Sequence, residues 1–190
     1  MNFRQLHRKT APIFFLPLLA TALTGVAYSL GIKWFGLDEK AATAKFFMTI
    51  HQGGFLGKPV VPIYVLLIGV GLLGLIITGL TMIKWQKSTS NRIVKQDIRW
   101  FHRILATIAF LPLILSASTG IIYRLGRAWF GLSEDQGEIL LDIHQGSYFG
   151  SFLEPVYVLL VGLGLVALLV TGIQMTGLFR KRLQPSSEES

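Results

Sequence analysis

The chain has four histidines and no cysteine, so imidazole is its strongest candidate ligand for a soft metal ion or a haem iron. His7 and His102 each lie in an RxxHR motif, and His51 and His144 each begin an HQG motif. Two imidazoles that face each other suit the two axial positions of a haem iron, whereas zinc normally takes three or four protein ligands. These residues therefore predict two bis-histidine sites that bind two haem b per chain.

The pairing of the histidines follows from an internal repeat. Residues 2–37 align without gaps on 97–132, and residues 46–83 align on 139–176, with about half of the positions identical. Each half has two spans, so the repeat is parallel and its pseudo-two-fold axis should run along the membrane normal. Each histidine is then expected to face its copy across this axis. The inner pair is His7 with His102, and the outer pair is His51 with His144.

The elements that must position these pairs are apolar helices. The composition is 52% hydrophobic and 15% charged, with a mean hydropathy of +0.56, which is too apolar for an ordinary soluble domain. Each of four uncharged runs has about the 20 residues that cross a bilayer as a helix. The runs are 11–32, 60–83, 104–123 and 156–177. We therefore expect an all-α membrane protein with four transmembrane helices, without room for a soluble domain that binds NAD(P)H or flavin.

The connections and ends complete this organisation. The repeats should cover residues 1–95 and 96–180, followed by a disordered tail over 181–190. The outer connections, 38–53 and 133–146, are predicted to form short interfacial helices, the second with Ser133 as its N-cap. They would carry the outer histidines near their carboxyl ends.

Basic residues predict the orientation. Most of them flank the N-terminus, the connection between the second and third spans, and residues 180–182. The positive-inside rule then predicts that both termini face the cytoplasm. The expected location is a bacterial inner membrane or a related energy-transducing membrane. The net charge of +8 reflects this orientation and contact with membrane lipid, and not binding to nucleic acid.

Four threonine-glycine pairs lie at the depths of the histidine pairs. A pair that follows its histidine by 17 residues is displaced by about 26 Å along a helix, which reaches the level of the outer pair. Glycine leaves room for a porphyrin, and threonine can hydrogen bond to a ligand imidazole or a propionate. The pairs at the outer level are Thr24-Gly25 and Thr119-Gly120, and those at the inner level are Thr78-Gly79 and Thr171-Gly172.

Arginines surround the inner histidines. Arg8 and Arg103 directly follow them, and Arg4 and Arg99 precede them by about one helical turn. Such cations can form charge-assisted hydrogen bonds with haem propionates. They can also anchor the helices among lipid headgroups, and the sequence leaves both roles open.

The order of these motifs resembles a known family. HR at the head of a span, TG in its outer half and HQG before the next span are similar to the PepSY-associated transmembrane family, which includes haem-binding iron-uptake proteins and siderophore-iron reductases. The resemblance covers about residues 4–180, but the outer loops are too short to hold the PepSY domain itself. It implies a haem-binding electron-transfer function, with the four histidines as ligands.

We therefore predict a di-haem b-type membrane cytochrome that transfers electrons across or within the bilayer. Because no nucleotide or flavin site is recognisable, its redox partner would be a quinol or another protein, and whether it is an enzyme stays open. The alternative from another class is a non-redox scaffold or assembly subunit of a larger membrane complex, which would use its glycine-rich helices for docking.

Overall fold

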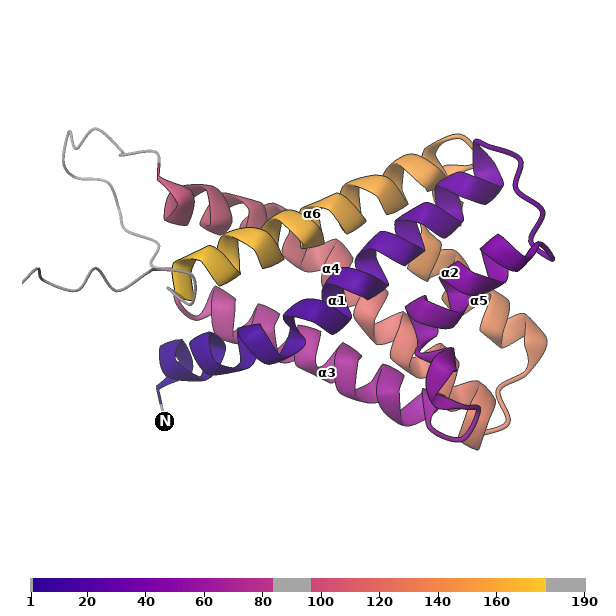
Figure 1. Ribbon diagram of the computed structural model, residues 1–190, viewed down its shortest axis with the longest axis horizontal. Coiled ribbons are helices and arrows are strands. Elements are labelled where there is room, and N and C mark those ends of the chain that lie inside the picture. The colour runs from indigo at the N-terminus through magenta and orange to yellow at the C-terminus, as the bar shows by residue number, and fades with distance from the viewer. Residues whose placement is uncertain (1, 84–96, 177–190) are drawn as a thin grey trace, which may run out of the picture.

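A computed structural model describes residues 2–83 and 97–176 of the chain, and every regular element in this part is helical. The same order of elements occurs in both halves, a long helix, a short helix, a 3-10 turn and another long helix (Figure 1). The elements are α1 (Phe3–Lys33), α2 (Ala42–Gln52), η1 (Gly54–Leu56), α3 (Val61–Leu80), α4 (Ile98–Trp129), α5 (Glu134–Gln145), η2 (Ser147–Phe149) and α6 (Leu153–Thr176). The predicted all-α fold is thus confirmed, and the predicted tail over 181–190 lies outside the described residues.

Four of these helices, α1, α3, α4 and α6, are long and apolar enough to cross a membrane. Helices α1 and α4 begin well before the apolar runs that predicted them, because their polar first turns are also helical. The side chains of Asn2 and Asp97 cap these ends by accepting hydrogen bonds from backbone N–H groups of the first turn. The inner histidines consequently lie inside continuous helices, in the polar turns that precede the predicted spans.

The two short helices differ in how they begin. Ser133 caps α5 as predicted, in a capping box with Gln136. Helix α2 begins at Ala42, later than predicted, because Asp38 holds the preceding residues in a turn: its carboxylate accepts from Lys40 N–H and its carbonyl from Ala41 N–H. Both helices end one residue after their histidine, so the prediction that the outer histidines lie near the carboxyl ends is confirmed.

The long helices pack as a four-helix bundle. Helix α1 packs along α6 and α3 along α4, while α2 folds back on α1 and α5 on α4, at the end of the bundle away from the N-terminus (Figure 1). Glycines allow the closest approaches: a Cβ at Gly71 would collide with the Phe14 ring, and one at Gly162 with the Val26 side chain. These two glycines therefore let neighbouring long helices pack closely inside the bundle.

One ion pair links the two halves near the end of the bundle that carries α2 and α5. Lys33 Nζ, at the end of α1, lies 3.1 Å from Oε2 of Glu154, which is only 4% exposed at the start of α6. The other carboxylate oxygen has no hydrogen-bond partner in the described residues. The Glu154 carboxylate therefore depends on Lys33 for its stabilisation in a buried position.

We expect Lys33→Met to destabilise the bundle more than Glu154→Gln. The first variant leaves a buried carboxylate without its cation, at a cost of about 1–3 kcal/mol, whereas the second leaves a lysine that can reach solvent. Thermal unfolding of both variants in the same detergent tests this order. Equal midpoints, or a lower one for Glu154→Gln, would contradict it.

Two candidate bis-histidine centres

The outer pair forms the better defined of two centres. The imidazole rings of His51, on α2, and His144, on α5, have centroids 6.2 Å apart and planes inclined by 77°. One metal atom between two imidazoles, with about 2 Å to each ligating nitrogen and about 1.1 Å from nitrogen to ring centre, separates the centroids by about 6 Å. The spacing thus matches that of two imidazoles that bind one iron. The structure brings together His51 and His144, the outer pair predicted from the sequence repeat.

Backbone carbonyls fix the orientation of both outer rings. His51 Nδ1–H donates to the carbonyl oxygen of Thr21 at 2.9 Å, and His144 Nδ1–H donates to that of Ser116, also at 2.9 Å. A carbonyl can only accept, so Nδ1 carries the proton in each ring. Nε2 is left as the lone-pair donor, and the hydrogen bond at Nδ1 is the usual support of a metal-bound histidine.

The surroundings keep the outer rings neutral. Both residues are largely buried, and both line a cavity of about 240 Å³, the outer cavity. Burial lowers the pKa of His144 to about 4, with the adjacent His51 contributing, and burial likewise lowers the pKa of His51. Both imidazoles are therefore unprotonated at Nε2 near pH 7, as a metal ligand must be.

The HQG motif has a local structural reason. Gly53 and Gly146 end α2 and α5 in the left-handed conformation, with φ of 73° and 74°. A Cβ at either glycine would collide with a tyrosine ring, Tyr64 or Tyr157, from the next long helix. The glycine thus ends the short helix and lets the tyrosine of the following long helix pack against the helix end. This contact fixes the position of the histidine two residues earlier in the chain. The two tyrosines recur at the same distance after each HQG, so this contact also has a signal in the sequence repeat.

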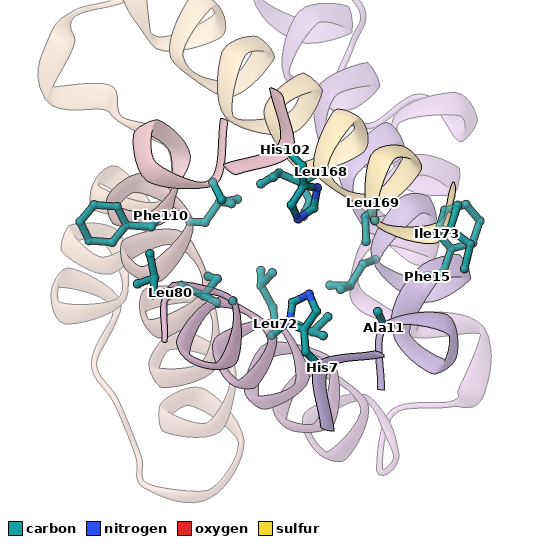
Figure 2. A pocket seen from close by; sticks show the side chains of 18 residues that line it. His7, Ala11, Phe15, Leu72, Leu80, His102, Phe110, Leu168, Leu169 and Ile173 are labelled. Atoms are coloured by element: carbon teal, nitrogen blue, oxygen red, sulfur yellow. The ribbon is translucent and has the colours of Figure 1, made fainter. Parts of the chain in front are cut away.

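The inner pair occupies a smaller cavity at the N-terminal end of α1 and α4. Figure 2 shows the rings of His7 and His102 facing each other across this inner cavity, whose volume is about 80 Å³. All its other lining residues are alanine, glycine, leucine, isoleucine or phenylalanine. The structure therefore brings the second predicted pair together as well, in an apolar setting.

Threonine hydroxyls orient the inner rings. His7 Nδ1 lies 2.9 Å from Thr78 Oγ1 on α3, and His102 Nδ1 lies 2.6 Å from Thr171 Oγ1 on α6. Each hydroxyl already donates to the carbonyl one turn earlier in its own helix, so it accepts from the imidazole N–H. The inner rings, like the outer ones, are left with Nε2 as the free lone pair.

The threonine-glycine pairs lie at the predicted depths. At the inner level, Gly79 and Gly172 sit against Cε1 of the histidines, and at the outer level Gly25 and Gly120 do the same. The nearest neighbour of each of these glycines in the protein is an imidazole ring, and the place of a porphyrin beside them stays a prediction. Thr24 makes no hydrogen bond with His51, and Thr119 Oγ1 lies a long 3.5 Å from His144 Nδ1, because backbone carbonyls hold the outer rings.

A layer of leucines separates the two centres. Leu18, Leu72, Leu113 and Leu165 line both cavities, and all four lie at equivalent positions of the sequence repeat. They belong to, or pack directly against, the buried core of the bundle. The leucine layer thus forms a common apolar wall between the inner and the outer cavity.

The four predicted arginines do not enter the inner cavity. The side chains of Arg4, Arg8, Arg99 and Arg103 are exposed, and none of them lines that cavity. Their role toward propionates stays a prediction. The cation that does line a cavity is Arg124 of α4, in the outer one. Identity between the two halves of the repeat does not reveal Arg124, because it aligns with Ser29.

In the described part of the chain, no three or more His, Cys, Asp or Glu residues gather where a metal ion could bind, so each cavity offers its donors as a pair of imidazoles. Compared with known proteins, the chain matches no family model, no curated protein and no solved structure.

Proposed function

We propose that the chain is a di-haem b-type membrane cytochrome, with one haem b held by the outer pair and one by the inner pair. The observation that carries this proposal is the outer pair: two neutral imidazoles at 6.2 Å, each with Nδ1–H bonded to a carbonyl and Nε2 free. Haem bound in this way supplies reversible one-electron chemistry at its iron.

The residues of the chain have distinct tasks in this proposal. The histidines would bind the iron of each haem, and Thr78, Thr171 and the carbonyls of Thr21 and Ser116 hold the rings in the orientation that leaves Nε2 free for it. The leucine layer excludes water between the cavities. Low solvent access at both centres keeps a charge change at the iron in an environment of low dielectric, which is one way in which a protein tunes a haem potential.

The proposed setting follows the resemblance to PepSY-associated membrane proteins and the distribution of basic residues. Both termini would lie in the cytoplasm of a bacterial cell, the inner pair near that side of the membrane and the outer pair near the other. Electrons would enter from, and leave to, a quinol or a partner protein, because the described helices contain no recognisable nucleotide site. Whether the chain works alone or within a larger membrane complex does not alter the two centres.

A reduced-minus-oxidised absorption spectrum of the purified protein tests the proposal. We expect sharp α and Soret bands on reduction and a low-spin ferric signal, because two imidazoles per iron give a strong ligand field. A protein that stays colourless after expression with haem available would favour the scaffold alternative instead. Against that alternative, Gly71 and Gly162 use their lack of a side chain inside the bundle, and not on a docking surface.

Two glycine variants give a finer prediction. A Cβ at Gly25 would stand 2.8 Å from Cε1 of His51, so Gly25→Ala must displace the ring. We expect this variant to weaken haem binding at the outer pair by about 10- to 100-fold, the usual effect of misorienting a ligand.

The matched control is Gly164→Ala. Its Cβ would stand 3.8 Å from Ala109 Cβ, an ordinary contact, and Gly164 lines neither cavity, so both haems should be retained. Haem content per chain measures both variants. Full retention in Gly25→Ala, or loss in Gly164→Ala, would contradict the geometry.

A further inference from the structure

Unpartnered polar atoms gather in the outer cavity. In the described residues, four buried side-chain nitrogen or oxygen atoms have no hydrogen-bond partner. Three of them belong to residues that line the outer cavity, namely Thr21 Oγ1, Ser29 Oγ and Arg124 Nε. Buried polar groups are rarely left unpaired, and all three of these atoms can donate a hydrogen bond. The outer cavity thus presents a set of donors without acceptors.

The charge of this set is unbalanced. No aspartate or glutamate lines the outer cavity, and the ion pair between Lys33 and Glu154 involves neither Arg124 nor any other lining residue. A guanidinium in a largely apolar cavity is costly unless an anion accompanies it. The outer cavity is therefore suited to a ligand that carries a negative charge and several acceptor atoms.

The position of Arg124 within the cavity indicates which part of a ligand it would meet. Ser29 and Arg124 follow Thr21 and Ser116, whose carbonyls hold the histidines, by eight residues in α1 and α4 respectively. Eight residues correspond to about 12 Å along a helix. Ser29 and Arg124 therefore lie beyond the imidazoles, toward the end of the bundle that carries the short helices, whereas Thr21 lies at the level of the His51 ring.

We propose that Arg124, together with Ser29, forms a carboxylate-binding site for the propionates of the outer haem. This inference rests on the proposed function and extends it, because it assigns the polar end of the outer cavity. A guanidinium and a carboxylate form a short, charge-assisted pair that can be bidentate. This pairing also accounts for the presence of an arginine in only one half of the repeat. One cation suffices to hold the propionate edge of the haem in one orientation.

The primary test is Arg124→Ser, which places the residue found in the other half of the repeat at this position. Loss of the cation favours the oxidised haem, so the midpoint potential of the outer haem should fall while that of the inner haem stays the same. A tenfold change in the ratio of reduced to oxidised haem, about 59 mV for one electron, is the expected size.

The matched control is Arg127→Gln. Arg127 lies one turn farther along α4, is exposed, and donates through Nη1 to the Leu132 carbonyl, outside the cavity. Its loss should leave both potentials unchanged. The double variant Ser29→Arg with Arg124→Ser moves the cation to the other half and should restore most of the outer potential. These two variants distinguish the effect of a charge inside the cavity on the outer haem potential from the effect of a general change in surface charge.

Haem dimethyl ester separates propionate binding from other causes. The ester lacks the carboxylates, so in protein reconstituted with it Arg124→Ser should no longer shift the outer potential or weaken outer-site occupancy. An equal shift with haem and with the ester, or no shift with either, would overturn the propionate site while leaving a di-haem protein intact. A wild-type protein that binds no haem would instead overturn the proposed function itself.

Discussion

His51→Ala and His144→Ala should each remove the same one of two haems, leaving about half of the wild-type haem per chain. In the proposed function these two rings, 6.2 Å apart, would both bind one iron, and a single remaining imidazole would hold haem far more weakly than two. His7→Ala and His102→Ala should both remove the other haem, because these residues share the inner cavity. Absorption and electron paramagnetic resonance spectra of the four variants show which component each one loses.

One experimental result would contradict the pairing of histidines from different halves. If His7→Ala and His51→Ala removed one common spectral component while His102→Ala spared it, ligands from the same half would share a haem. The leucine layer lies between those two positions, and neither the inner nor the outer cavity holds both His7 and His51.

Thr78→Val should weaken haem binding at the inner pair by about 10- to 100-fold, and Thr171→Val should do the same. Valine keeps the shape of threonine but removes the oxygen that accepts from His7 Nδ1 or His102 Nδ1. The freed ring can rotate, and its buried N–H lacks an acceptor. Haem titration of the apoprotein, followed at the Soret band, measures the loss.

The matched control for this prediction is Thr24→Val. Thr24 is the first threonine-glycine residue at the outer level, but its hydroxyl bonds to the Ala20 carbonyl and not to His51. The outer haem should therefore be unaffected by this change. Equal losses in Thr78→Val and Thr24→Val would indicate a general effect on the helices, and would contradict a specific hydrogen bond to the inner ligand.

The sequence predicted the fold and the histidine pairs because both depend on patterns that extend over many residues, namely the apolar runs and the internal repeat. Apolar runs of about 20 residues specify membrane-spanning helices almost by themselves. The repeat then assigned each histidine its partner, and helical rise placed the threonine-glycine pairs at the right depth. Gly25 lies beside His51 and Gly79 beside His7, at the depths that the helical rise predicts.

The sequence could not predict side-chain directions. Arg8 and Arg103 stand next to the inner histidines in sequence, yet on a helix neighbouring residues point about 100° apart, and these arginines are exposed. Thr24 and Thr78 occupy similar motifs, but one bonds only to its own helix and the other accepts from an imidazole. Arg124 was missed for the opposite reason, since its importance lies in a difference between the two halves.

The stoichiometry of haem to protein tests the central claim most directly. Pyridine haemochrome absorbance, measured against protein mass on the purified full chain, should give two haem b per chain, because two separate cavities each bring two histidines together. One haem per chain would leave one histidine pair without the assigned role. A protein without haem would contradict the cytochrome proposal altogether.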